Sequence, residues 1–237
     1  MELRFLTPET PNDGEEQREL LERELAGGAD GVVLIPADRD TLETAVRGAS
    51  CAVVTLETEM DSGDACVGVD NHALGEALAR SAMNGVYQDG TVLLLDSVPG
   101  NNGIRERCEA AQALLEQEGR QVVRVVPSEE GTIADRLRDL ILRLDPEAVM
   151  AVEASMLEEA AQVIRSMKAE NSCPWKCPPL LYGMGSTPAI AAGLEQSHIT
   201  SIQAQDDFSS GYIAVMTAAQ VIRHQSVREP EEKSSWA

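Results

Sequence analysis

Short apolar runs alternate with longer amphipathic stretches along most of the chain. The runs are Leu3–Leu6, Gly31–Ile35, Ala52–Leu56, Ala65–Val69, Thr91–Leu95, Gln121–Val126, Ala148–Val152, Leu180–Tyr182 and Ile199–Ala204. A stretch with helical periodicity follows nearly every run. This pattern predicts an α/β protein with parallel sheets that helices cover on both faces. In such sheets, ligands bind at the carboxyl ends of the strands.

Capping residues indicate where several of the helices begin and end. Asp13 is the expected N-cap of a helix that runs to about Ala26, and Gly27 and Gly28 end it. Asp40 is expected to cap a short helix after the second run. Asp206 and Asp207 precede the last helix, from about residue 208 to 224, and one of them is expected to cap it.

The spacing of the strands predicts two sheets. Ala52–Leu56 and Ala65–Val69 are separated by a brief loop with no helix, which breaks the strand–helix alternation. We interpret this break as the point where the chain leaves one sheet for another. Residues 1–69 and 206–225 are expected to form an N-terminal lobe and residues 70–205 a C-terminal lobe. Residues 226–237 form a polar tail.

Composition narrows the range of partners. The formal charge of the 237 residues is −21, and aromatic residues make up only 3% of the chain. A polyanion would be repelled and would find little stacking surface, so nucleic acid is not an expected partner. No apolar run approaches the length of a membrane span. We find no nucleophile–base pair and no dinucleotide fingerprint, so neither an enzyme nor a cofactor is predicted.

The cysteines are scattered and odd in number: Cys51, Cys66, Cys108, Cys173 and Cys177. They do not resemble a disulfide framework. The Cys173–Cys177 pair is compatible with a metal half-site, a local disulfide or a loop with incidental thiols. No second cysteine pair and no nearby histidine would complete a metal site, so no metal is predicted.

Several blocks of sequence resemble the type I, ribose-binding-like superfamily of periplasmic binding proteins. In order, the blocks are Ala29–Asp38, Val53–Glu57, Val67–Asn71 with Gly75 behind it, Val98–Arg107, Gly183–Pro188 and Ile202–Asp206. Their order and spacing over roughly residues 1–225 carry the resemblance. It implies two Rossmann-like lobes, joined by crossovers, with a solute trapped between them.

The resemblance also implies that the N-terminus of this chain differs from that of the family. The family's first strand and helix, which lie centrally in the N-terminal lobe, have no counterpart here, and Met1–Leu6 reads like the family's second strand. Our expectation is that the chain is an N-terminally truncated product or has a misplaced start.

The resemblance suggests a set of ligand-binding residues. Arg107 and Gln205 match family positions that contact sugar. Glu57 and Thr58 stand where the family has an aspartate–arginine pair, and Glu153 stands where it has an asparagine. These five residues are therefore the expected ligand contacts. Taken alone, an arginine near a helix start usually forms a surface ion pair.

The chemistry of these groups suits a hydroxyl-rich solute. A polyol donates and accepts hydrogen bonds, and a guanidinium, carboxylates and an amide can replace its lost water. The two acids also allow an amino-bearing analogue. Gly185 stands where the family has an aspartate, so this binding mode differs from the usual one.

The expected function is a solute-binding protein of a bacterial ABC-type importer or of a sensor, closing two lobes around a sugar or sugar-like molecule. Its partner would be an ABC permease or a membrane sensor. Its location would be extracytoplasmic if an upstream signal or anchor exists. The alternative is the effector-binding domain of a repressor-type transcription regulator, which has the same fold.

Overall fold

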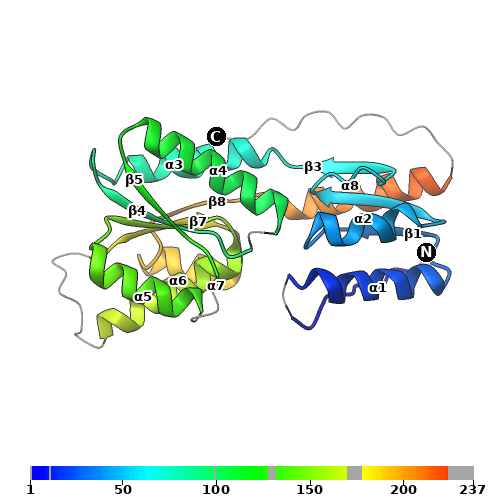
Figure 1. The fold of residues 1–237 in the computed structure, drawn as a ribbon, viewed down its shortest axis with the longest axis horizontal. Helices are drawn as coiled ribbons and strands as arrows, with labels where there is room; N and C mark the ends of the chain where they lie inside the picture. The colour runs from blue at the N-terminus through cyan, green and yellow to red at the C-terminus, as the bar shows by residue number, and fades with distance from the viewer. Residues whose placement is uncertain (1, 11, 99, 128–131, 170–177, 224–237) are drawn as a thin grey trace. The chain divides into compact units, whose positions relative to one another are not determined.

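The structure is a computed structural model that describes residues 2–10, 12–98, 100–127, 132–169 and 178–223. The chain divides into two compact units (Figure 1). Unit 1 comprises Met1–Val69, Gly100–Asn102 and Asp206–Ala237, and unit 2 comprises Asp70–Pro99 and Gly103–Gln205. The main crossings between the units therefore lie after Val69 and after Gln205.

Unit 1 is built on a parallel sheet with the strand order β1-β2-β3. Leu42 and Val46 of one helix pack on one face of this sheet, and a second helix is stacked on the first. Ala214 and Ala218 of a third helix pack on the opposite face, against Val54. The elements are α1 (Gly14–Ala26), β1 (Gly31–Leu34), α2 (Arg39–Arg47), β2 (Ala52–Glu57), β3 (Ala65–Gly68) and α8 (Asp207–Ile222), with α1 stacked on α2.

Unit 2 is built on a parallel sheet with the strand order β5-β4-β6-β7-β8. Alternate residues of β4 face opposite cores, because Leu93 and Leu95 join one apolar cluster while Val92 and Leu94 join the other. The elements are α3 (Asn71–Met83), β4 (Thr91–Leu95), α4 (Asn102–Gln117), β5 (Gln121–Val125), α5 (Ile133–Leu144), β6 (Ala148–Ala151), α6 (Ala154–Ala169), β7 (Leu180–Met184), α7 (Pro188–Glu195) and β8 (Ser201–Gln203).

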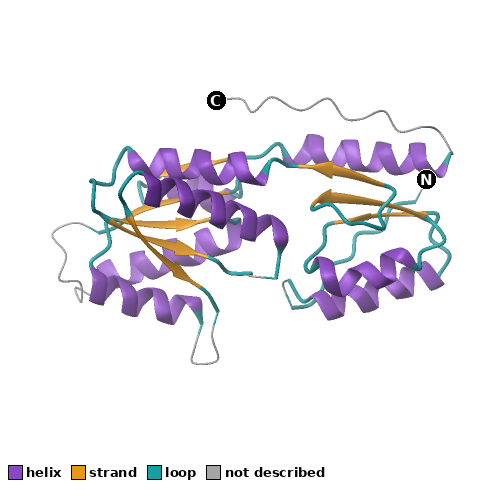
Figure 2. Ribbon diagram, turned by 45° about the horizontal axis from the view of Figure 1, so that its top comes forward, coloured by secondary structure: helices purple, strands orange, loops and turns teal. Residues whose placement is uncertain are grey.

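Helices cover both faces of each sheet, as Figure 2 shows. In unit 2, α3 and α4 lie on one face of the sheet, and α5, α6 and α7 lie on the other. Every strand pairing is parallel. The predicted α/β architecture with two separate parallel sheets is therefore confirmed.

The predicted first strand, Leu3–Leu6, is not formed. This segment has no strand hydrogen bonds, and Phe5 is 91% exposed. Its contact with α1 is an ion pair of 2.6 Å between Arg4 and Glu24. The prediction was wrong because apolar alternation indicates only that a segment can join a sheet. Within the described residues, β1 is an edge strand that pairs with β2 alone, and Leu3–Leu6 does not pair with its outer edge.

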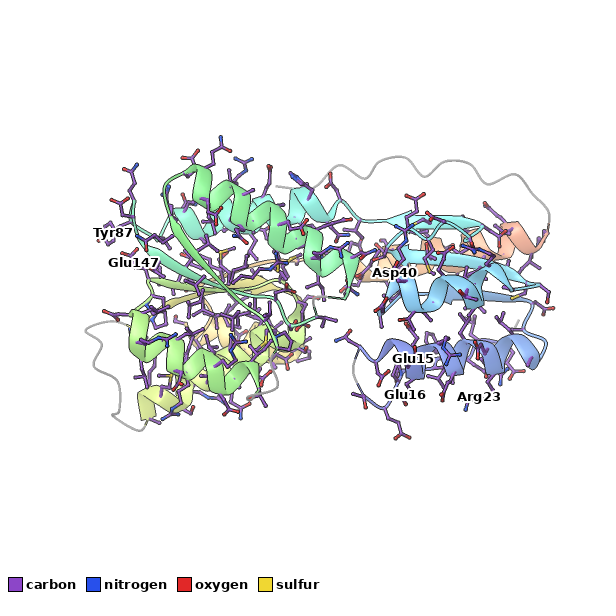
Figure 3. The ribbon with its side chains drawn as sticks, viewed as in Figure 1. Glu15, Glu16, Arg23, Asp40, Tyr87 and Glu147 are labelled. Carbon is purple, nitrogen blue, oxygen red and sulfur yellow. The ribbon has the colours of Figure 1, made fainter. Side chains whose placement is uncertain are left out.

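The predicted helix caps are partly confirmed. The Asp13 side chain accepts the Glu16 N–H, and the Asp206 side chain accepts the Ser209 N–H. The predicted Asp40 cap is wrong, because Asp38 caps α2 and accepts the backbone N–H groups of Asp40 and Thr41. Asp40 lies within the first turn of α2 (Figure 3), where its negative charge still interacts favourably with the positive end of the helix.

A side-chain contact holds the chain just after helix α3. The helix ends at Met83, and the Tyr87 N–H then donates to the Glu147 carboxylate at 2.7 Å (Figure 3). Glu147 directly precedes β6, so this bond ties the turn after α3 to the sheet.

Two features of the sequence lie outside the described residues: the Cys173–Cys177 pair and the tail at residues 226–237. Among the residues that are described, no helix is long and apolar enough to cross a membrane. The same part of the chain contains no cluster of three or more histidine, cysteine or acidic residues arranged to hold a metal ion.

Candidate functional site

Arg107 is buried inside unit 2. It lies in the second turn of α4 and is 4% exposed. Its Nε donates a hydrogen bond of 2.7 Å to Asn71 Oδ1, and its Nη1 approaches the Val152 carbonyl oxygen at 3.4 Å. Arg107 is therefore not a surface arginine. The guanidinium is placed beside the carboxyl end of β6, where a doubly wound sheet binds its ligands.

The start of α3 packs closely on Arg107. Asn71, the first residue of α3, is 3% exposed, and Asp70 caps the helix by accepting the Ala73 N–H at 2.8 Å. One turn later, a Cβ added to Gly75 would lie 2.3 Å from the Arg107 backbone oxygen. Only glycine lets the two helices approach so closely. The sequence block that ends in Asn71, with Gly75 behind it, thus corresponds to a contact between α3 and α4.

Glu153 follows β6 and serves as the cap of α6. Its carboxylate accepts the backbone N–H groups of Ser155 at 2.9 Å and Met156 at 2.7 Å. It also accepts the hydroxyls of Ser155 and Ser97, the latter at 3.0 Å. These bonds occupy most of the lone pairs of the carboxylate. Glu153 therefore joins the ends of β4 and β6 to the N-terminus of α6.

Glu57 and Thr58 lie at the carboxyl end of β2 in unit 1. Glu57 has a φ of 69°, in the left-handed region that most residues avoid. The next residue, Thr58, is buried at 8% exposure. Backbone strain of this kind is often found at functional positions.

Gln205 ends unit 2, two residues after β8. It is partly exposed. Because β8 is the last strand in the order of its sheet, Gln205 lies at the edge strand farthest from β5. Its carboxamide can both donate and accept a hydrogen bond.

Gly185 lies where the resemblance would place an aspartate, and its backbone does not suit one. Its φ is +125°, and an added Cβ would lie 2.7 Å from the Ala154 Cβ. A larger residue would be strained and would also collide with α6. The absence of that carboxylate is thus part of the local packing in this chain.

A second buried charge, which the sequence analysis did not select, lies at the carboxyl end of β4. Asp96 is 1% exposed and forms an ion pair of 2.7 Å with Arg124 of β5. Asp96 Oδ1 has no hydrogen-bond partner among the described residues. Nearby, burial and the charge of Asp96 raise the pKa of the Cys108 thiol to about 12. The sequence feature that could have identified Asp96 is its position directly after the apolar run Thr91–Leu95.

The structure brings some of the predicted residues together within each unit. In unit 2, Arg107 contacts the backbone of Val152, the residue before Glu153. In unit 1, Glu57 and Thr58 are neighbours at the end of β2. Parallel strands align their carboxyl ends on one edge of each sheet, so each unit presents polar groups at the edge where ligands bind.

Comparison with known proteins gives one family match, the periplasmic binding protein domain, over residues 2–226. The chain is also similar to the ribose import binding protein of Bacillus subtilis (strain 168). The two are 21% identical over 232 residues, and the match covers 96% of this chain and 74% of that protein.

Solved structures of low sequence identity have the same fold. A solute-binding protein of a carbohydrate transporter from Agrobacterium radiobacter, in complex with D-arabinose, aligns with a TM-score of 0.77 and 20% identity, covering 92% of this chain and 76% of that one. An ABC transporter solute-binding protein from Agrobacterium vitis, with bound D-fucose, aligns with a TM-score of 0.76 and 17% identity, covering 90% and 76%.

Proposed function

Because the chain belongs to the periplasmic binding protein domain family, we propose that it is the solute-binding protein of a bacterial ABC-type importer. Its ligand, on this proposal, is a sugar or a sugar-like small molecule, its partner is the importer's permease, and its location is extracytoplasmic. Periplasmic binding protein domains bind solutes and are not enzymes, so no catalytic step is assigned.

The observation that supports ligand binding most strongly is the buried guanidinium of Arg107. A buried charge is costly unless hydrogen bonds compensate it, and Arg107 is held by Asn71 and Val152 at the carboxyl end of β6. Its planar group carries five N–H donors in a fixed arrangement. Such a fork can donate to two adjacent hydroxyl oxygens of a sugar ring.

The remaining predicted contacts differ in how well their geometry suits binding. We assign Gln205 a direct role, because its carboxamide can pair with a hydroxyl that both donates and accepts. Glu57 and Thr58 would contribute acceptors from unit 1. We assign Glu153 a supporting role, because the bonds to Ser97, Ser155 and Met156 already engage its carboxylate.

The sugars named in the similar proteins define the first ligands to test. They are ribose, D-arabinose and D-fucose. Micromolar affinity corresponds to about 8 kcal/mol, which a few buried hydrogen bonds with some apolar contact can supply. Two of the expected contacts, Glu57 and Glu153, are carboxylates that could pair with an amino group. Amino sugars are therefore included in the screen.

A thermal melting screen tests the proposal. A ligand present at about 100 times its Kd stabilises the folded state by about 2.7 kcal/mol. In a chain of this size, that should raise Tm by about 5–10 °C. We expect such a shift with at least one sugar, polyol or amino sugar and none with amino acids or nucleotides. No shift with any of the hydroxylated compounds would contradict the proposal.

A further inference from the structure

The contact between Asn71 and Arg107 has features beyond those of an ordinary buried hydrogen bond. Both side chains are almost completely buried, at 3% and 4% exposure, and the bond joins residues 36 positions apart. The acceptor is the neutral oxygen of a carboxamide, and the donor is the Nε of a cation. No assigned ligand contact involves Asn71.

We propose that Asn71 is a positioning residue that fixes the plane of the Arg107 guanidinium for ligand binding. This inference rests on the proposed solute-binding function. A guanidinium is planar, so fixing Nε at Asn71 and Nη1 at Val152 determines where its remaining N–H groups point. A preorganised donor loses less conformational freedom when a ligand binds.

The neutrality of the Asn71 acceptor matters to this role. A carboxylate in its place would form a charge-assisted, often bidentate, pair with arginine. Such a pair would take a second N–H group away from the ligand. A carboxamide oxygen is neutral and accepts a single N–H group of the guanidinium. Asparagine therefore orients Arg107 without competing strongly with the hydroxyls of a sugar.

The backbone of α3 supports the same arrangement. The Asp70 cap fixes the start of the helix, and Gly75, four residues after Asn71, lets α3 lie against the backbone of Arg107. One face of α3 thus holds both the main chain and the side chain of Arg107. Unit 2 begins at Asp70, so the hydrogen bond between Asn71 and Arg107 is formed by the first turn of the first helix of that unit.

The first experiment needs no ligand. Hydrogen exchange of the Arg107 Nε–H is measured by NMR in the wild type, Asn71→Ala and Asn71→Asp. We expect exchange to be at least tenfold faster in Asn71→Ala and to remain slow in Asn71→Asp, which keeps an acceptor. Asn84→Ala, at the exposed end of the same helix, is the matched control and should behave as the wild type. Equal exchange in wild type and Asn71→Ala overturns the inference.

The second experiment is a double-mutant cycle by calorimetric titration with D-ribose, D-arabinose and D-fucose. Asn71→Ala and Arg107→Met should each weaken binding at least tenfold. The double variant should bind no more weakly than Arg107→Met alone, because Asn71 acts through Arg107. Losses that simply add would show that Asn71 acts independently and would overturn the inference.

The two experiments separate the failure of the inference from the failure of the proposed function. If the wild type binds none of the three sugars, the proposed function fails for these ligands. The exchange rate of the Arg107 Nε–H then still decides whether Asn71 holds the guanidinium. Unchanged melting temperatures of the ligand-free variants, within a few degrees, exclude loss of folding as the cause of weaker binding.

Discussion

Gly75→Ala tests the close contact between α3 and α4 on which the geometry of Arg107 depends. The added methyl carbon would lie 2.3 Å from the Arg107 carbonyl oxygen and 3.0 Å from both its carbonyl carbon and its Cα. All three are backbone atoms, so no side-chain rotation can relieve the collision. The two helices would have to move apart by roughly 1 Å, into a core that is packed at crystal-like density.

Two opposing effects determine the magnitude. Alanine in the interior of a helix is favoured over glycine by about 1 kcal/mol. Overpacking a close contact costs about 1–3 kcal/mol, and rigid backbone partners place this site at the upper end. We therefore expect Gly75→Ala to lower the free energy of unfolding by about 2 kcal/mol.

The assay is urea denaturation followed by circular dichroism, with Gly211→Ala as the control. Gly211 lies inside α8, and an added Cβ there would meet no atom within 4 Å. The control should be more stable than wild type by about 0.5–1 kcal/mol, through helix propensity alone. If Gly75→Ala were stabilised to the same extent as the control, the close approach of α3 to Arg107 would be refuted.

Two further predictions concern the buried groups near β4. Arg124→Met should destabilise unit 2 by about 3 kcal/mol in the same urea assay, because Asp96 would remain as a buried carboxylate without its cation. The double variant with Asp96→Asn should recover much of this loss, and a single variant as stable as the wild type would contradict the reasoning. Cys108, with a pKa of about 12, should resist iodoacetamide at pH 8, since only about one thiol in ten thousand is then ionised. Labelling in the native protein as fast as in urea, measured by peptide mass mapping, would show that the thiol is not buried.

The sequence predicts the fold well where a short apolar run has strand neighbours. The runs at β1, β2 and β4 are all strands, because each pairs with a neighbouring strand of a parallel sheet. Leu3–Leu6 is also a short apolar run, but it pairs with no strand in the part of the chain that the structure describes. Sequence periodicity carries no information about pairing partners. Asp40 was mistaken for a cap because Asp38, two residues earlier, is also a good capping residue, and backbone geometry decides between them.

The contacts within the candidate site are harder to predict from the sequence than the fold is. Arg107 could be selected from its block, but its burial depends on Asn71 and Val152, which are distant along the chain. Glu153 was selected as a ligand contact, and only the structure shows its bonds to Ser97 and to the first turn of α6. Contacts of this kind arise from tertiary packing, which local patterns do not encode.

The most direct test of the central claim compares two arginines of α4 by calorimetric titration. Arg107 is buried and held by Asn71, whereas Arg105, two residues earlier, is an exposed partner of Glu109. With the sugar that gives the largest melting shift, Arg107→Met should weaken binding at least tenfold, and Arg105→Met should bind as the wild type does. Wild-type affinity in Arg107→Met would show that the buried guanidinium has no part in holding a ligand.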